Sequence, residues 1–207
     1  MVTEHAKQAV RKILRPAQVS ASAAQSGGEV DVNLSQKYAQ LNERLTAFKA
    51  LSSGEVLLEG QANAVGLKLH QDAEHPRDVL VTSSAGEIVR VDAAKDPASR
   101  WTALHLELGA MDLSAIDTIG VLIKSRSYLS ATTTQVCLRS GTHNKFRDCF
   151  LSHHMVSTPV EGRHFDVHQV GTDTQLPRVA DWHELVLFFR SDHDLDLSII
   201  DLRLFAL

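Results

Sequence analysis

The sequence predicts a mainly β protein, an antiparallel β-sandwich of the jelly-roll type with an N-terminal helical appendage. Two observations support this fold class. From Gly54 onward, apolar residues recur at every second position in about nine to eleven short segments, as in half-buried antiparallel strands. Gly, Pro, Asp and Ser separate the segments and no long helical pattern interrupts them, so βαβ units are not expected.

The first 53 residues form the predicted appendage. Residues 3–15 have a helix-forming composition that stops before Pro16, and the small, polar residues 16–32 are typical of a flexible linker. Residues 33–53 form the clearest helix. Its apolar residues have the four-three spacing of a coiled-coil seam: Leu34, Tyr38, Leu41, Leu45 and Phe48. Two interpretations stay open, a helix packed on the edge of the following domain and a short coiled coil that makes a homo-oligomer.

Residues 54–207 form the predicted sandwich, and its last two strands carry the clearest patterns. Residues 183–190 are apolar on both alternations, so this strand should lie centrally in a sheet or be covered on its second face. The final segment alternates, which predicts that Ile200, Leu202 and Leu204 point into the core. The chain would then end inside a sheet, as jelly rolls commonly do.

The composition of the chain limits the classes of partner that it is expected to bind. A net charge of −4 gives no basic field that would attract nucleic acid or an anionic membrane. No apolar run has the length of a signal peptide or a membrane span, so we expect a cytoplasmic protein. Cys137 and Cys149 are the only cysteines. Reduced thiols are expected in that compartment, with a disulfide between neighbouring strands as the alternative.

Polar side chains that share strand faces form the candidate ligand site. They come from three predicted strands: Trp101, His105 and Glu107; Lys124 and Arg126, with Tyr128 just beyond; and Arg139, beside Gln135 and Cys137. If these faces line one sheet, they offer a stacking surface, a carboxylate and several donors for sugar hydroxyls. The alternative is that they are the solvated side of a sandwich.

Histidines suggest a second, metal-binding hypothesis. The stretch HFDVH places His164, Asp166 and His168 on one strand face. Its ends lie about 13 Å apart in a regular strand, so one ion can use only a neighbouring pair. His154 or His153 from a nearby strand would complete a two-His, one-carboxylate set. The alternative is a group of surface histidines without a metal.

Catalytic motifs are scarce in the sequence. It contains no nucleophile elbow, P-loop or Rossmann glycine pattern. Four carboxylates could pair across strands as in a glycoside hydrolase: Glu107, Asp148, Asp166 and Glu184. The alternative is ordinary cross-strand ion pairs, so an enzyme is the less favoured interpretation.

Four segments resemble the strands of the galactose-binding-like jelly roll used by many carbohydrate-binding modules. They are WTALHLELG, DLSAIDTIGVLIKSRS, WHELVLFF and the closing LDLSIIDLRLFAL. The resemblance covers residues 54–207 and implies a saccharide ligand. The chain departs from such modules in having only two Trp and two Tyr, and no dense acidic loop for calcium.

The sequence therefore predicts a non-catalytic binding module for a carbohydrate or a glycan-bearing partner. No cofactor is expected, and a structural calcium ion is left open by the resemblance alone. An assembly protein, with a sheet face that meets another protein, is the alternative. A carbohydrate-active hydrolase is the third hypothesis.

Overall fold

The computed structural model describes residues 34–51, 54–142, 145–173 and 176–207. The predicted helix over residues 3–15 and the linker over 16–32 lie outside these ranges. The described residues form one helix, α2 (Leu34–Leu51), and twelve strands. The strands are β1 (Glu55–Leu57), β2 (Leu67–Gln71), β3 (Val79–Ser83), β4 (Val89–Ala93), β5 (Thr102–Asp112), β6 (Thr118–Ser127), β7 (Thr132–Thr142), β8 (Lys145–Phe150), β9 (Met155–Ser157), β10 (Gly162–Gln169), β11 (Val179–Phe189) and β12 (Leu195–Ala206).

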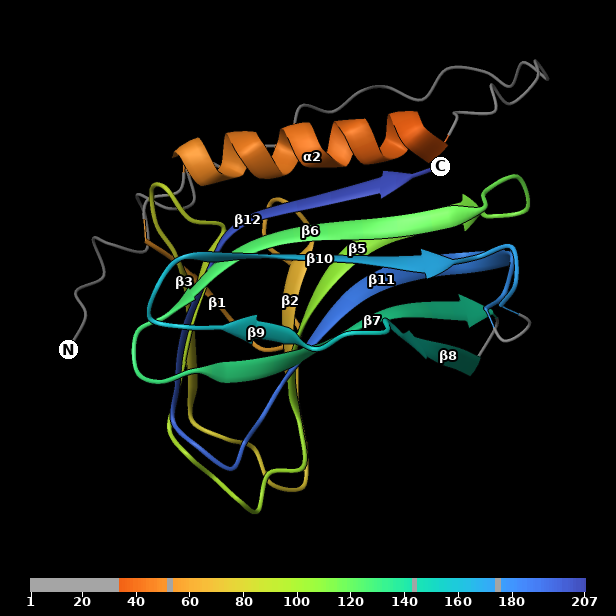
Figure 1. Ribbon diagram of the computed structural model, residues 1–207. Helices are drawn as coiled ribbons and strands as arrows, with labels where there is room; N and C mark the ends of the chain where they lie inside the picture. Colours follow the sequence, from red (N-terminus) through yellow and green to blue (C-terminus); the bar gives the residue numbers. More distant parts are fainter. Residues whose placement is uncertain (1–33, 52–53, 143–144, 174–175) are drawn as a thin grey trace, which may run out of the picture. The chain divides into compact units, whose positions relative to one another are not determined.

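The strands form two antiparallel sheets that pack face to face (Figure 1). Sheet A has the order β1-β3-β4-β12-β6-β10, and sheet B has the order β2-β5-β11-β7-β8, with β9 also paired to β7. The predicted antiparallel jelly-roll sandwich is confirmed. Strand β11 lies between β5 and β7, which confirms the central position predicted from its two apolar faces.

The core lies between the sheets and is built from one face of each strand. Leu104, Leu106, Leu185 and Leu187 of sheet B are all buried, as the alternating pattern requires. Complete burial of each such side chain contributes about 1.5–3 kcal/mol. These residues pack in one cluster with the inner face of sheet A, so a single core joins the two layers.

The last strand departs from simple alternation. Leu202 and Leu204 are buried as predicted, but Ile200 is only half-buried and the fully buried residue is Ile199. The pairing of β12 with β6 slips between Ile199 and Asp201. Such a β-bulge inserts one residue and reverses which alternate positions face the core. The prediction for Ile200 is wrong for this reason.

Helix α2 lies along β12 (Figure 1) and closes an open edge of sheet A. Beyond Ile199, β12 no longer pairs with β4. There the side-chain amide of Asn42 donates to the Leu204 carbonyl at 2.8 Å and accepts from the Leu204 N–H at 3.0 Å. The amide therefore replaces the hydrogen bonds of a missing neighbouring strand.

The apolar side of α2 packs against the sandwich of the same chain. Tyr38, Leu41 and Leu45 are buried in the core of the sandwich, and Phe48 packs partly against it. The compact unit accordingly runs from Val32 to Leu207 and includes the helix. Among the described residues, no helix combines the length and the apolar character of a membrane span.

Both cysteines are free thiols. Cys137 lies opposite Phe150 and Leu138 lies opposite Cys149 in the pairing of β7 with β8. Because neighbouring residues of a strand point to opposite faces, the two thiols face opposite sides of sheet B. The alternative of a cross-strand disulfide is not realised.

Candidate functional site

The outer face of sheet B, which points away from the core, gathers polar and aromatic side chains in rows across neighbouring strands. One row runs through Glu107, Glu184, Arg139 and Asp148, which lie opposite one another on β5, β11, β7 and β8. The next row runs through Lys68, His105, Val186, Cys137 and Phe150. Side chains directly opposite in antiparallel strands are close enough to interact, so each row is a continuous surface.

The charged groups of this face pair with one another. Lys68 forms an ion pair with Glu107. His105 Nδ1 lies 2.8 Å from Glu184 Oε2, and Arg139 holds Asp148 with two hydrogen bonds, of 2.6 and 2.8 Å. Lys68, His105 and Arg139 thus each contact a carboxylate, so the charged groups of this face are paired within the protein.

Glu184 is held in its ionised form. Burial acts to raise the pKa of its carboxyl group, but the hydrogen bond from His105 and the positive charges of His105, Lys68 and Arg139 outweigh burial. The net effect lowers the pKa of Glu184 below its ordinary value. A carboxylate of this kind accepts hydrogen bonds and does not donate a proton near neutral pH.

Aromatic rings lie between and beside these charges. A side chain at Gly141 would overlap the indole of Trp182, with a Cβ only 2.0 Å from a ring atom, so Trp182 lies flat over this glycine. Phe188 packs against Phe150 at a ring-centroid distance of 5.8 Å. The Arg139 guanidinium lies 5.7 Å from the Phe188 ring centroid, within the range of a cation–π contact.

On this face one hollow lies toward each end of β11. The first has a volume of about 430 Å³, and its lining includes Trp101, Gln135, His154, Phe188, Arg100 and Arg190. The second, of about 550 Å³, is lined by Lys68, Glu107, Trp182 and Glu184 and by Arg44 of helix α2. Each hollow therefore combines at least one aromatic ring with polar groups, the usual composition of a small-molecule site.

The structure divides the predicted ligand residues between two faces. Trp101, His105, Glu107 and Arg139 lie together on the outer face of sheet B. The second strand of the prediction, β6, belongs to sheet A, so the three strands do not line one sheet. The reason is the jelly-roll connection, since β6 follows β5 and precedes β7 in the chain but crosses to the opposite layer.

The three predicted residues of β6 and its following turn make their own contacts on the outer side of sheet A. Lys124 pairs with Glu161 at 2.5 Å, and Arg126 donates to the Pro159 carbonyl at 3.0 Å. The ring of Tyr128 is flanked by the guanidinium groups of Arg90 and Arg126, at 4.3 and 4.9 Å from its centroid. This ring is exposed and lines neither of the two hollows on sheet B.

Other residues of the face were missed by sequence reasoning. Lys68 and Phe188 line the two hollows but were not among the predicted ligand residues. A signal for Phe188 existed, because it belongs to the second apolar alternation of the segment 183–190. Nothing in the spacing indicated Lys68, whose partner Glu107 is 39 positions away.

The predicted metal ligands are likewise divided between the two sheets. Asp166 accepts hydrogen bonds from the backbone N–H of His153, at 2.8 Å, and pairs with its ring at 3.1 Å. His154 lies on the other sheet's outer face, 3.1 Å from Gln135. The predicted set of His154, His164, Asp166 and His168 is therefore not brought together.

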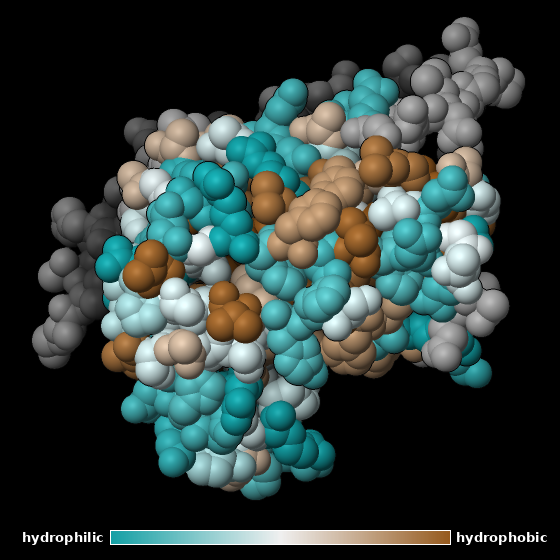
Figure 2. All heavy atoms as spheres, viewed as in Figure 1, coloured by the Kyte–Doolittle hydropathy of each residue, from teal (hydrophilic) through white to brown (hydrophobic). Residues whose placement is uncertain are grey.

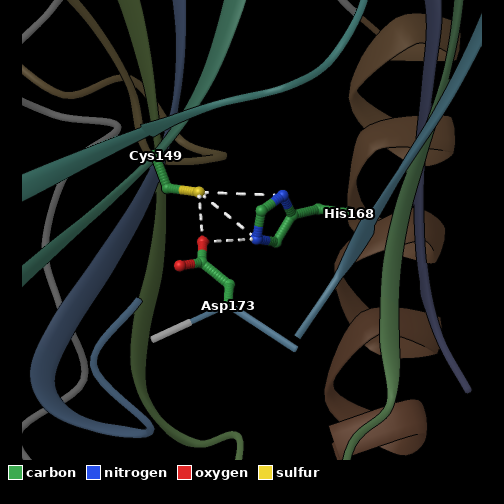
Figure 3. Close-up of side chains that lie close together, drawn as sticks. All are labelled: Cys149, His168 and Asp173. Atoms are coloured by element: carbon green, nitrogen blue, oxygen red, sulfur yellow. Dashed lines mark hydrogen bonds and ion pairs between the residues drawn. The ribbon is translucent and has the colours of Figure 1, made fainter. Parts of the chain in front are cut away.

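His168 instead belongs to a cluster with Cys149 and Asp173 (Figure 3). In the part of the chain that the structure describes, this is the group of three side chains arranged to hold a metal ion. Burial and the neighbouring Asp173 carboxylate raise the pKa of the Cys149 thiol to about 12. Without a metal, Cys149 is therefore a neutral thiol near pH 7.

The fold is similar to that of solved carbohydrate-binding modules. A family 4 module (described as "CBM4 structure and function") is 13% identical over 74% of this chain and 95% of that chain, with a TM-score of 0.55. The family 11 module from Clostridium thermocellum, in complex with a β-1,3-1,4-mixed-linked tetrasaccharide, is 9% identical over 74% and 96% of the two chains, with a TM-score of 0.50.

At such identities the similarity is one of fold. No protein-family model matches the sequence, and no curated protein matches it. The fold is a β-sandwich of the carbohydrate-binding-module type, which confirms the resemblance found in the sequence.

Proposed function

We propose that this protein is a non-catalytic module that binds a neutral saccharide on the outer face of sheet B. The observation that carries the proposal is the pair of hollows on that face, each with an aromatic ring beside polar groups. The family 11 module of the same fold is described in complex with a tetrasaccharide. A chain of sugar units is a ligand that could reach from one hollow to the other.

The side chains suit this class of ligand. Indole and phenyl rings present a flat apolar surface to the C–H face of a sugar ring, and their polar neighbours bind its hydroxyl groups. Arg139 and Asp148 fix each other's orientation through two hydrogen bonds, so little conformational freedom is lost on binding. Because Lys68 and Arg139 are already paired with carboxylates, a neutral saccharide fits better than an acidic one.

The same contacts argue against glycoside hydrolysis. Glu107 and Glu184 lie directly opposite each other on β5 and β11. A hydrolase needs one carboxyl group that stays protonated to act as the acid, which requires a raised pKa. Glu184 has a lowered pKa, and Glu107 is ion-paired with Lys68.

The test is a calorimetric titration of the full chain with a panel of neutral β-glucan and acidic oligosaccharides. Trp182→Ala removes the ring over Gly141, and Tyr128→Ala is the matched control because it removes an exposed ring from the opposite side of the sandwich. We expect Trp182→Ala to weaken binding by about tenfold or more, equivalent to about 1.4 kcal/mol, and Tyr128→Ala to leave it unchanged.

Other outcomes would redirect the assignment. Loss of binding in Tyr128→Ala alone would place the ligand on sheet A, with Lys124 and Arg126. Failure of every saccharide to bind would favour the assembly hypothesis, in which a sheet face meets another protein. On the side of the molecule that Figure 2 shows, hydrophobic residues form separate patches among polar ones, which gives that hypothesis no broad apolar surface there.

A further inference from the structure

Three side chains that the saccharide face does not use converge at the open edge between the two sheets. Cys149 Sγ lies 3.3 Å from His168 Nε2 and 3.1 Å from Asp173 Oδ2, and the latter two atoms are 2.8 Å apart. Figure 3 shows the three side chains pointing toward one another. They offer one thiol sulfur, one imidazole nitrogen and one carboxylate oxygen, which are the three atom types that zinc binds in proteins.

The geometry differs from that of a catalytic Cys-His-Asp arrangement. In a triad the thiol and the carboxylate bond to opposite nitrogens of the imidazole, so that a proton can pass along the line. Here both approach the same nitrogen, His168 Nε2, and the thiol sulfur is farther from Nδ1, at 3.7 Å. A triangle of donor atoms around one point is suited to a cation.

The separations between the three donor atoms are close to those required around a zinc ion. Tetrahedral zinc with bonds of about 2.3 Å to sulfur and about 2.0–2.1 Å to nitrogen and oxygen places its ligand atoms about 3.3–3.6 Å apart. The three observed separations are each shorter than this by less than about 0.6 Å, by comparison with the same ideal values. Rotations of the three side chains are enough to open the triangle by that amount.

The ligands are held by anchored backbone. Cys149 is on β8, where it lies opposite Leu138, and His168 is on β10 of the other sheet. Between His168 and Asp173, Val170 is fully buried in the core. The Leu176 N–H donates to the other oxygen of Asp173 at 3.3 Å and so directs Oδ2 toward the cluster.

We propose that Cys149, His168 and Asp173 form a zinc site that ties the edge of sheet B to the edge of sheet A. Zinc binds the thiolate, so the Cys149 thiol gives its proton to solvent as the sulfur–zinc bond forms. Three protein ligands leave the fourth tetrahedral position for a water molecule, and the His168 and Asp173 side chains are 15% and 17% exposed. The thiolate and imidazole also exclude calcium, which prefers oxygen ligands.

The experiment uses the full chain, reduced and freed of metal with a chelator. Zinc is titrated by calorimetry, and cobalt(II) is added separately because sulfur ligation gives it a near-ultraviolet charge-transfer band. The variants are Cys149→Ser and Asp173→Asn, and the matched control is Cys137→Ala. Cys137 is the other free cysteine, buried on the opposite face of sheet B.

We expect one equivalent of zinc, a cobalt–sulfur band, and a higher melting temperature with zinc, all retained in Cys137→Ala. Cys149→Ser should weaken zinc binding at least ~100-fold, since even residues that only orient ligands are worth about 10- to 100-fold. The chain has eleven histidines that could bind zinc without this site. Equal zinc binding by wild type and Cys149→Ser, or no stoichiometric binding by the wild type, would therefore overturn the proposal.

The Asp173→Asn variant distinguishes the loss of a metal ligand from a loss of folding. It keeps the shape of the side chain and the acceptor for the Leu176 N–H, but removes the charge that the metal needs. We expect it to weaken zinc binding while the metal-free melting temperature stays close to that of the wild type. Unchanged zinc affinity in a folded Asp173→Asn protein would also overturn the three-ligand assignment.

Discussion

One side-chain amide, that of Asn42, hydrogen-bonds helix α2 to the backbone of β12, and its contribution can be tested by Asn42→Ala. The substitution leaves the N–H and the C=O of Leu204 without the partners they have at 3.0 and 2.8 Å. An unsatisfied backbone group costs about 1–3 kcal/mol when buried, and this site is only partly buried, so the lower end applies to each group. With two such groups, we expect the free energy of unfolding to fall by about 2 kcal/mol.

Urea unfolding followed by circular dichroism measures this loss. The midpoint should move to lower urea with an unchanged slope, because the surface exposed on unfolding stays the same. Glu43→Ala is the matched control, since Glu43 is the exposed neighbour of Asn42 on the same helix and should change stability by less than about 0.5 kcal/mol. An Asn42→Ala protein as stable as Glu43→Ala would refute the idea that this amide replaces a strand.

Three further predictions concern stability and pH. Arg77 is buried and donates to four backbone carbonyls around the end of β4 and the β11–β12 turn. Arg77→Lys should therefore lower the free energy of unfolding in urea by about 3 kcal/mol or more, and a smaller loss would contradict this. The buried Tyr38 hydroxyl has no partner among the described residues, so Tyr38→Phe should raise the melting temperature; a fall would contradict this. Burial of His183, only partly offset by the Met111 carbonyl, lowers the pKa of this histidine, so the unfolded chain takes up its proton first and stability falls as the pH drops below about 6.5. His183→Gln should reduce the slope of unfolding free energy against pH by up to about 1.4 kcal/mol per unit, and an unchanged slope would argue against this assignment.

The fold could be predicted because a strand buried on one side has apolar residues at every second position of its sequence. The central strand β11 was also recognisable, since Leu185 and Val186 face opposite sides and both are buried. The position of Ile200 was not predictable in this way. A β-bulge is a property of the pairing with a second strand, and neither its place nor its effect on alternation is contained in one strand's pattern.

The site was less predictable because it depends on which strands share a sheet. Residues on one strand face, such as His105 and Glu107, follow from alternation alone. Placing Arg126 beside them required β6 to lie next to β5, and the chain crosses to sheet A at that point instead. The Cys149–His168–Asp173 cluster is harder still to predict, because it joins two sheets and only the spacing of His168 and Asp173 is local.

The saccharide face and the zinc cluster use the same strand without competing for its side chains. Strand β8 turns Asp148 and Phe150 toward the outer face of sheet B and Cys149 toward the inside. Asp148 is held by Arg139 on β7, which β11 in turn holds in register, so its orientation does not depend on Cys149. Cys149→Ser should therefore remove zinc binding and keep saccharide binding, whereas Trp182→Ala should do the reverse. If Cys149→Ser also abolishes saccharide binding, the two sites are coupled through the order of edge strand β8.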